Sequence, residues 1–188
     1  MYKILKKEVL NSAVILMEVE APYVAFRCEP GQFIIARIGD EGERIPLTIA
    51  DFDREKNTIT IVFQALGYST KEMAKLEVGD SFLDFVGPLG SPAPFKKEWK
   101  RIIGVAGGVG SAPLYCQLKA LAENGVSCDV IIGGRSAEFV ILADMFAKFC
   151  DHVYIMTDDA TPFAQEQPDP DINVRVMYLT MILHADTY

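Results

Sequence analysis

Three closely spaced glycines near the middle of the chain are the residues best suited to hold an anionic ligand. Gly107, Gly108 and Gly110 follow an apolar run over residues 102–106 that predicts a buried strand, and a helical pattern opens at Ser111. Glycines let backbone amides approach an anion closely, and the start of a helix favours negative charge. The segment therefore predicts either a phosphate cradle for a dinucleotide or a tight strand-to-helix turn without a ligand.

The spacing of these glycines matches no standard fingerprint. It differs from the G-x-G-x-x-G pattern of dinucleotide-binding folds and from the phosphate-binding loop that ends in lysine. Pro113 is compatible with the first helical turn, where its missing N–H is not needed. The choice between a ligand site and a plain turn therefore depends on the rest of the chain.

Arg44, Pro46 and Thr48 form a second group, at the start of a predicted strand. A guanidinium can bind a pyrophosphate, and a threonine hydroxyl can both donate to and accept from a ring nitrogen. The alternative is an exposed arginine in front of an edge strand.

Gly67, Ser69 and Thr70 form a third group, where a strand ends in a turn and a short helix begins. Such a helix start can receive a phosphate through its backbone amides and hydroxyls. The alternative is an ordinary capped helix.

The predicted secondary structure that must position these groups changes along the chain. Short β-rich runs separated by turns predict a small antiparallel barrel over residues 1–99. Its predicted strands cover residues 13–20, 32–38, 57–64 and 81–86, and its predicted helix covers residues 69–76.

Residues 100–159 alternate between strands and helices in the order βαβαβ, which predicts a parallel sheet with right-handed crossovers. The predicted strands cover residues 102–106, 128–132 and 152–156, and the predicted helices cover residues 111–123 and 138–149. Residues 160–188 do not continue this alternation, so a complete nucleotide-binding sheet would lack two strands and two helices. We expect this tail to be either a naturally short end or a truncated or frame-shifted reading.

Composition excludes several classes of function. The chain has 188 residues, half of them apolar, and a net charge of −8, which argues against nucleic acid or an anionic membrane as the main partner. No signal pattern opens the chain, and no apolar run approaches the roughly 20 residues of a membrane span. The four scattered cysteines form no C-x-x-C pair, as expected of reduced thiols in a cytoplasmic protein. Neither the two histidines nor the serines fall in a metal-ligand or hydrolase pattern, so we predict no catalytic side chain and no metal ligand.

Taken together, four segments resemble the ferredoxin–NADP reductase superfamily in their order and spacing. The resemblance covers residues 1–159 and is strongest to two small members. These are the α subunit of NADH-dependent ferredoxin:NADP oxidoreductase, also met as a sulfide dehydrogenase subunit, and the electron-transfer subunit of dihydroorotate dehydrogenase. The four segments are Arg44-Ile-Pro-Leu-Thr48, Gly67-Tyr-Ser-Thr70, Gly87-Pro-Leu-Gly90 and Ala106-Gly-Gly-Val-Gly-Ser-Ala-Pro113.

The resemblance implies a β + α/β protein, with an antiparallel FAD-binding barrel at 1–99 followed by an incomplete NAD(P)-binding domain at 100–159. Thr48 would lie near the reactive flavin N5, and Leu47 would replace the aromatic residue that many relatives lay on the ring. Arg44 stands one position earlier than the usual family arginine. The implied cofactor residues are Arg44, Pro46, Leu47 and Thr48 for the flavin, Gly67, Ser69 and Thr70 for its pyrophosphate, and Gly107, Gly108, Gly110 and Pro113 for the nicotinamide nucleotide.

Two residues at predicted strand ends bear on the choice between NADH and NADPH. Asp158 ends the third strand of the parallel sheet, where a carboxylate accepts from ribose hydroxyls and repels a 2′-phosphate. Arg135 works in the other direction because it could pair with that phosphate. We expect a preference for NADH.

The resulting hypothesis is a flavoprotein electron-transfer subunit that oxidises NAD(P)H through FAD and passes electrons to ferredoxin or to a larger catalytic subunit. The alternatives are the electron-transfer subunit of dihydroorotate dehydrogenase and a non-catalytic, nucleotide-binding regulatory subunit. Small family members carry four C-terminal cysteines for a 2Fe–2S cluster, and this chain lacks that group. A basic patch of Lys96, Lys97, Lys100 and Arg101 is expected near the flavin edge, where it would either dock ferredoxin or be a solvated linker.

Overall fold

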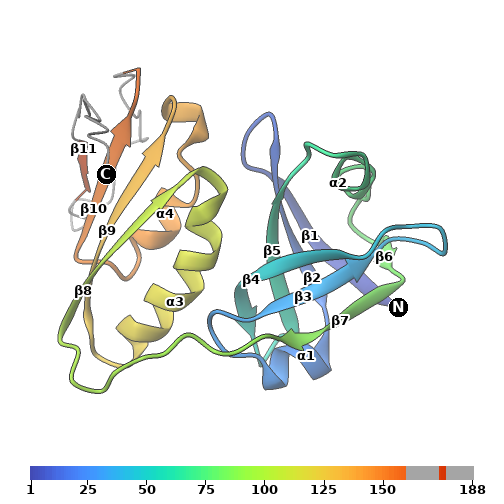
Figure 1. Cartoon of the computed structure of the whole chain (residues 1–188), viewed down its shortest axis with the longest axis horizontal. Coiled ribbons are helices and arrows are strands. Elements are labelled where there is room, and N and C mark those ends of the chain that lie inside the picture. Colours follow the sequence, from blue (N-terminus) through green and yellow to red (C-terminus); the bar gives the residue numbers. More distant parts are fainter. Residues whose placement is uncertain (160–173, 177–188) are drawn as a thin grey trace, which may run out of the picture.

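The computed structural model describes residues 1–159 and 174–176, which form two β-sheets side by side (Figure 1). The first sheet is antiparallel and seven-stranded, in the order β6-β1-β2-β5-β4-β3-β7. Its strands are β1 Tyr2–Val9, β2 Val14–Glu20, β3 Phe33–Arg37, β4 Ile45–Asp53, β5 Thr58–Gln64, β6 Ser81–Phe82 and β7 Asp84–Leu89, and its helices are α1 Pro22–Arg27 and α2 Tyr68–Met73.

This sheet curls into a nearly closed barrel. Its two outermost strands, β6 and β7, are consecutive in the chain with only Leu83 between them, so the two ends of the sheet must meet. Alternate side chains point inward along the strands, and Met17, Ile34, Ile61 and Phe82 are fully buried in the interior. The predicted antiparallel barrel is therefore confirmed.

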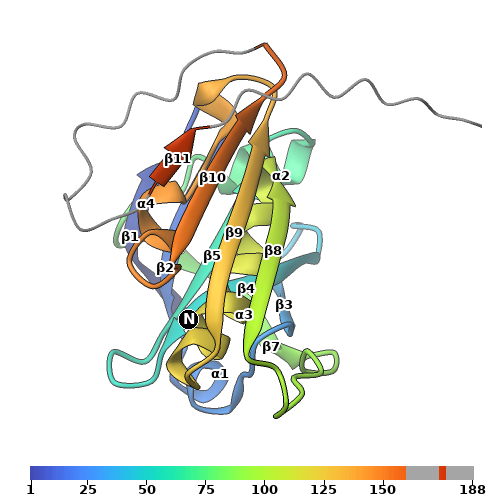
Figure 2. The ribbon, with the colours of Figure 1, turned by 90° about the vertical axis from the view of Figure 1, so that its left-hand side faces the viewer.

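The second sheet is parallel, in the order β11-β10-β9-β8 (Figure 2). Helix α3 coincides residue for residue with the helix predicted at 111–123, and the predicted strand–helix alternation is confirmed. The elements are β8 Arg101–Gly107, the 3-10 turn η1 Gly108–Gly110, α3 Ser111–Glu123, β9 Ser127–Gly134, η2 Ala137–Phe139, α4 Ala143–Phe146, β10 His152–Thr157 and β11 Val174–Val176.

The prediction of one continuous helix over residues 138–149 is wrong. The structure divides it into the short turn η2 and the four-residue helix α4. Leu142 lies between them at φ +63°, in the left-handed region that breaks an α-helix. Strand β1 and helix α1 were not predicted either. In β1 only Ile4 is buried, so the strand shows no alternation of buried and exposed positions.

Helix α3 joins the two sheets into one packed unit. It lies between the parallel sheet and the barrel (Figure 1), and one buried cluster contains side chains from both. Leu16 and Val62 come from the barrel, whereas Tyr115 and Leu118 come from α3. The cluster therefore fixes the orientation of the parallel sheet on the barrel.

A polar cluster on the parallel sheet crosses three strands. The buried carboxylate of Asp129 on β9 accepts from Arg101 Nε at 3.0 Å and Nη2 at 2.6 Å, and its other oxygen lies 2.8 Å from His152 Nδ1. Burial acts to raise the pKa of Asp129, but the hydrogen bonds to Arg101 and His152 outweigh it and lower that pKa below its usual value. The cluster ties the start of β8 to β9 and β10.

We expect replacement of Asp129 by Asn to change how stability depends on pH. The carboxyl pKa is lower in the folded state, so the wild-type carboxylate stabilises the fold above about pH 4 and loses that effect as pH falls further. At neutral pH, D129N should therefore melt roughly 3–6 °C lower, with a smaller difference from wild type near pH 3. Thermal melts across this pH range measure the effect, with the exposed Glu41→Gln as control. A gap between D129N and wild type that stays constant with pH would contradict the assignment.

Candidate functional site

The carboxyl ends of the parallel strands bring the predicted nucleotide residues to one edge. Gly107, the last residue of β8, pairs in register with Gly133 of β9, and the next three residues form η1. The amide of Asp158, just after β10, donates to the carbonyl of Gly134 at 3.1 Å. Gly107, Gly108, Gly110, Arg135 and Asp158 therefore lie along the same edge of the sheet, as predicted from their positions at strand ends.

The glycines at this edge face open space. A Cβ atom built on Gly108 or Gly110 would have no neighbour within 4 Å, and one on Gly107 would meet only the Gly133 carbonyl at 3.8 Å. Gly104, in the middle of β8, is different, because its Cβ would lie 2.6 Å from Leu118 Cδ1. Packing within the described residues thus explains the glycine at 104 but leaves room beside the other three. Gly108 also has φ +52°, which favours glycine for conformational reasons.

Helix α3 starts directly behind these glycines and carries an unsatisfied hydroxyl. Its N-cap residue Gly110 offers no side-chain cap, so the first amides of a thirteen-residue helix point toward the glycine turn. Ser111 Oγ is fully buried and has no hydrogen-bond partner among the described residues. Pro113 lies in this same first turn and its carbonyl accepts from Gln117 Nε2 at 3.2 Å. The turn therefore offers open space and one unpaired hydroxyl, whereas the Ser111 amide already donates to the Gly108 carbonyl.

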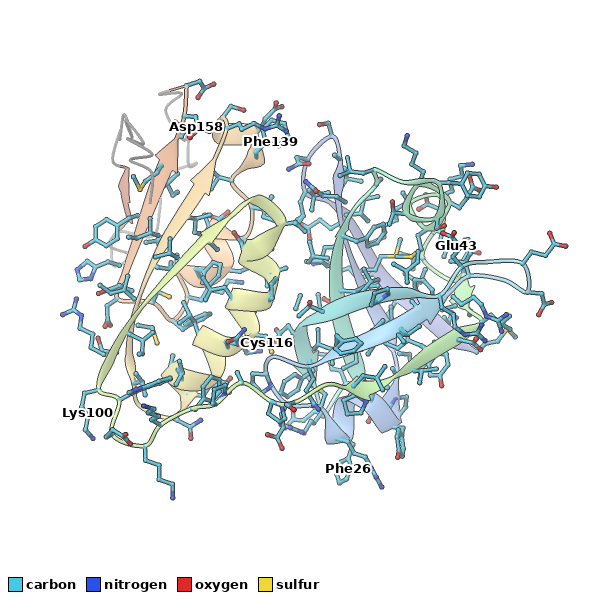
Figure 3. The ribbon with its side chains drawn as sticks, viewed as in Figure 1. Phe26, Glu43, Lys100, Cys116, Phe139 and Asp158 are labelled. Carbon is cyan, nitrogen blue, oxygen red and sulfur yellow. The ribbon has the colours of Figure 1, made fainter. Side chains whose placement is uncertain are left out.

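Arg135 is held at the strand end by an aromatic ring that the sequence reasoning missed. Its guanidinium carbon lies 4.9 Å from the centre of the Phe139 ring, a cation–π contact. Figure 3 shows Phe139 and Asp158 at the same end of the parallel sheet. The signal in the sequence was an aromatic residue four positions after Arg135, which is too common to be noticed alone.

The second predicted group lies on and before strand β4. Pro46, Leu47 and Thr48 pair with β3, opposite Ile35, Ile34 and Phe33 in turn. Pro46 is exposed and Thr48 is half-buried, so the strand presents these residues at the barrel surface.

Arg44 precedes β4, with its side chain 62% exposed and a 3.4 Å contact from Nη2 to Asp84 Oδ2. Asp84 is held more closely by Arg37, whose Nε lies 2.7 Å away. The Arg44 guanidinium therefore remains accessible to a further anion.

The third predicted group caps helix α2. The Gly67 amide donates to Thr70 Oγ1 at 3.1 Å, and the same hydroxyl donates to the Gly67 carbonyl at 3.2 Å. Ser69 Oγ donates to the carboxylate of Glu43, in the loop that leads to β4. The second and third groups are thus brought together in space, although more than 20 residues separate them in the chain.

A cleft of about 250 Å³ opens where these two segments meet. Glu43 and Ile45 line it from one side, and Tyr68, Ser69 and Met73 line it from α2. Glu43 was not among the predicted site residues, because its contact with Ser69 depends on how the barrel folds.

The two regions adjoin each other. The turn η1, which holds Gly108 and Gly110, contacts strand β5, and β5 leads within three residues to Gly67. The glycine turn of the parallel sheet and the α2 cleft of the barrel therefore share one side of the molecule.

The predicted basic patch stands at the opposite end of β8 from the glycine turn. Lys100 and Arg101 stand at the amino end of β8, whereas the glycine turn stands at its carboxyl end. A seven-residue strand is about 20 Å long, and Figure 3 shows Lys100 at the opposite end of the sheet from Asp158. The patch of Lys96, Lys97, Lys100 and Arg101 is separated from the nucleotide edge by the full length of the strand.

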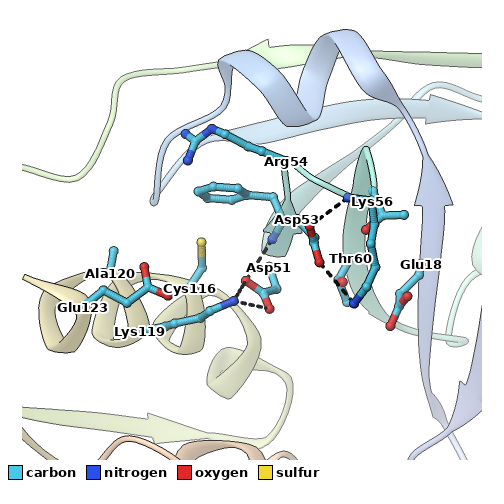
Figure 4. A pocket seen from close by; sticks show the side chains of 12 residues that line it. Glu18, Asp51, Asp53, Arg54, Lys56, Thr60, Cys116, Lys119, Ala120 and Glu123 are labelled. Carbon is cyan, nitrogen blue, oxygen red and sulfur yellow. Dashed lines mark hydrogen bonds and ion pairs between the residues drawn. The ribbon is translucent and has the colours of Figure 1, made fainter.

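A charged pocket of about 380 Å³ lies between the barrel and α3 (Figure 4). Its cations already have partners in the protein. Lys119 Nζ donates to both oxygens of Asp51 at 2.8 and 2.9 Å, and Lys56 Nζ lies 3.1 Å from Asp53. Arg54 Nη2 donates to the Cys28 carbonyl at 2.9 Å. The cations that line this pocket are therefore already paired within the protein, whereas the glycine turn faces open space.

The cysteines do not gather into a cluster. All four are free thiols, and Cys28, Cys116 and Cys128 are buried. Burial raises the pKa of Cys28 and Cys128 to about 11 and that of Cys116 and Cys150 to about 12, so they remain protonated. In the part of the chain that the structure describes, no three His, Cys, Asp or Glu side chains converge to hold a metal. The described helices also include none that is long and apolar enough to cross a bilayer.

Comparison with known proteins supports the fold and the resemblance. No family model matches the chain. It is 47% identical over 167 residues to an uncharacterised protein of Clostridium beijerinckii, covering 86% of this chain and 56% of that protein. It is 36% identical over 159 residues to a Thermotoga maritima homologue of the dihydroorotate dehydrogenase B (NAD⁺) electron-transfer subunit, covering 85% of this chain and 56% of the homologue.

A solved structure of NADH-dependent reduced ferredoxin–NADP oxidoreductase superposes with a TM-score of 0.80 at 34% identity. The match covers 86% of this chain and 58% of that one. The chain thus spans little more than half the length of the relatives it matches. The flavin-barrel and nucleotide-sheet architecture expected from the resemblance is confirmed.

Substitutions at two glycines can distinguish a glycine that leaves room for a ligand from one that close packing requires. We expect Gly110→Val to leave the melting temperature nearly unchanged, because its side chain enters open space, but to weaken nicotinamide nucleotide binding about tenfold or more. Gly104→Ala should do the opposite, lowering stability by about 1–3 kcal/mol through its clash with Leu118 while preserving affinity. Calorimetric titration and thermal melts of both variants test this. Equal affinity of G110V and wild type would exclude the glycine turn as the binding surface.

Proposed function

Because the chain has the fold of the ferredoxin–NADP reductase superfamily, we propose that it is a flavoprotein electron-transfer subunit that oxidises NAD(P)H through FAD. The observation that carries the proposal is the open glycine turn at Gly107–Gly110, which adjoins the barrel strand leading to Gly67. Two anion-binding surfaces on one side of the molecule suit two nucleotides that must meet.

On the barrel, we assign the flavin to the surface formed by β4 and α2. Arg44 retains an accessible guanidinium, and Gly67, Ser69 and Thr70 supply the start of α2, so both can hold phosphate oxygens. The exposed end of β4, with Pro46, Leu47 and Thr48, would lie along the ring. Two phosphate-binding positions favour FAD, which has two phosphates, over FMN, which has one.

On the parallel sheet, we assign the nicotinamide nucleotide to the glycine turn and the first turn of α3. The open turn at Gly107–Gly110 leaves room for phosphate oxygens, and Ser111 Oγ is a buried hydroxyl in need of a partner. Pro113 restricts the backbone of this turn. Arg135 and Asp158 then stand at the neighbouring strand ends, where they would meet the ribose.

The residues of this chain would bind and orient the cofactors. A bound flavin supplies the chemistry that the protein side chains lack, accepting a hydride from reduced nicotinamide and releasing electrons singly. The barrel and the parallel sheet, locked together by α3, would set the distance between the two binding surfaces. A proton-transferring side chain is not needed for hydride transfer, in agreement with the prediction of no catalytic residue.

The residues do not fit a 2Fe–2S cluster. Cys28 is buried in the barrel, while Cys116 is buried in α3 and Cys128 in β9. Fully buried, protonated thiols on three separate elements cannot converge on one cluster without unfolding the core. We derive no electron path through such a cluster in this chain.

We propose ferredoxin or a larger catalytic subunit as the electron acceptor. We favour a permanent complex with a catalytic subunit, as the name of the Thermotoga maritima homologue, an electron-transfer subunit of dihydroorotate dehydrogenase B, supports. A non-catalytic regulatory subunit is the second candidate, since a nucleotide could bind at the open glycine turn without electron transfer.

Purified protein is expected to carry FAD. It should absorb near about 450 nm, and flavin released by acid should run as FAD on chromatography. Arg44→Ala should lower the flavin content severalfold because it removes an accessible phosphate ligand, whereas Arg27→Ala on α1 should not. Colourless protein that nevertheless binds nicotinamide nucleotide would identify the regulatory subunit, and released FMN would refute the assignment of two phosphate positions.

NADH should reduce the bound flavin faster than NADPH. Asp158→Ser should narrow this preference by about tenfold by removing the charge that repels a 2′-phosphate. Arg135→Ala should widen it instead, because that cation could pair with the phosphate. Stopped-flow reduction with each nucleotide measures both ratios. Equal rates with NADH and NADPH in the wild type would contradict the expected preference.

A further inference from the structure

The hydroxyls of Ser69 and Thr70, at the start of α2, have different partners. Thr70 Oγ1 accepts from the Gly67 amide and donates to the Gly67 carbonyl, so it is used within the cap of its own helix. Ser69 Oγ instead donates to the carboxylate of Glu43, which lies 26 residues earlier in the chain. A hydroxyl has one proton to donate, so Ser69 cannot donate to Glu43 and to a phosphate oxygen at the same time.

The loop between β3 and β4 holds Glu43 beside α2. The Gly42 amide donates to the Gly39 carbonyl at 2.9 Å, which closes a tight turn in this loop. A Cβ atom on Gly42 would lie 3.1 Å from that carbonyl oxygen, so the turn leaves little space for a side chain. Arg44, the residue after Glu43, contacts Asp84 at the start of β7. Two consecutive residues of opposite charge therefore connect this loop to two different elements.

Glu43 carries a charge that no ion pair among the described residues balances. Other carboxylates near the cleft do have cations, since Asp84 lies 2.7 Å from Arg37 Nε and Glu72 lies 2.6 Å from Lys75 Nζ. The hydrogen-bond partner of Glu43 is a neutral hydroxyl. A phosphate group that enters the cleft would therefore meet an uncompensated negative charge at close range.

We propose that Glu43 takes the place of a flavin phosphate oxygen in the cofactor-free protein and must release Ser69 before FAD binds. The inference rests on the proposed function, because it takes the flavin phosphates to lie at Arg44 and at the start of α2. Carboxylate and phosphate are both anionic acceptors, so each can receive the hydrogen bond from Ser69, and their charges repel each other. Glu43 thereby lowers the affinity for flavins that carry phosphate.

Adjacent residues then act in opposite directions on one ligand. The Arg44 guanidinium attracts the phosphates, whereas the Glu43 carboxylate competes with them for Ser69. The affinity for FAD is the difference between these two effects, so Glu43 is a specificity-determining residue that acts on the phosphates and not on the flavin ring.

Titration of the flavin-free full chain with FAD and with riboflavin tests the proposal. Glu43→Gln keeps an oxygen that can accept from Ser69 but removes the charge, so FAD should bind about three- to tenfold more tightly than to the wild type. Riboflavin has no phosphate, so its affinity should change less than about twofold. Calorimetric titration measures both dissociation constants, and raised salt should reduce the difference for FAD.

Glu41→Gln is the matched control. Glu41 is exposed and lines the same cleft, but it has no hydrogen bond or ion pair among the described residues. The variant should therefore change FAD affinity less than about twofold. Equal gains in affinity for E41Q and E43Q would overturn the proposal, because the general charge of the cleft would then explain both.

Ser69→Ala supplies a double-mutant cycle. This variant removes the donor for which the carboxylate and the phosphate compete, so E43Q should raise FAD affinity less in the S69A background than in the wild type. The same gain in both backgrounds would overturn the competition for Ser69. An equal gain for riboflavin and FAD would also overturn it, since the phosphates would then not be the groups that Glu43 opposes.

Failure of this inference and failure of the proposed function give different results. Wild-type protein that binds FAD, with E43Q equal or weaker in affinity, would overturn the role of Glu43 alone. Binding of FAD to neither protein would refute the flavin surface itself and the inference with it. Because Glu43 is exposed, flavin-free E43Q should melt within about 2 °C of the wild type, which shows that the variant is folded.

Discussion

Helix α3 is the element on which the arrangement of the whole molecule depends. It packs against β8 and β9 on one side and against β4 on the other, so one helix belongs to two cores at once. Lys119, on the barrel side of α3, adds a bidentate ion pair to Asp51 at the end of β4. Close packing of interdigitating side chains and this directional ion pair together fix one orientation. The distance between any ligand on the barrel and any ligand on the parallel sheet is set by this contact.

Helix α3 also explains why a glycine that close packing requires lies within a few residues of glycines that face open space. Gly104 lets Leu118 and Leu114 pack directly onto the backbone of β8, which pulls α3 close to the sheet. Three residues later the requirement reverses, and the glycines of the turn leave space that the described residues do not fill. Close packing at Gly104 thus holds the start of α3 rigidly against the sheet, and the open turn is presented on a fixed helix end.

Local signals in the sequence were sufficient for the elements whose burial follows a simple period. The boundaries of α3 and the positions of the three strands β8, β9 and β10 needed only apolar periodicity and turn residues. The helix expected at 138–149 failed because Leu142 takes a left-handed conformation that no local preference for leucine predicts. The contact between Glu43 and Ser69 could not be predicted, because it exists only once the barrel has closed.

The burial of the thiols and the position of the basic patch together restrict where electrons could leave the protein. With cysteines enclosed in both cores, a flavin at the barrel surface would be the redox group nearest to solvent in the proposed complex. An acceptor must then approach the side that carries β4 and α2, and the basic patch stands away from the nucleotide edge, at the far end of β8. Because charges act over about 10 Å at ordinary salt and a full strand separates the patch from the nucleotide edge, attraction to the patch would not draw an acidic partner to that edge. Beside α2, Leu66 is 67% exposed and Tyr68 is 82% exposed, so recognition at the proposed flavin surface can depend on apolar contact, which is the character of a lasting subunit interface rather than a charge-steered encounter.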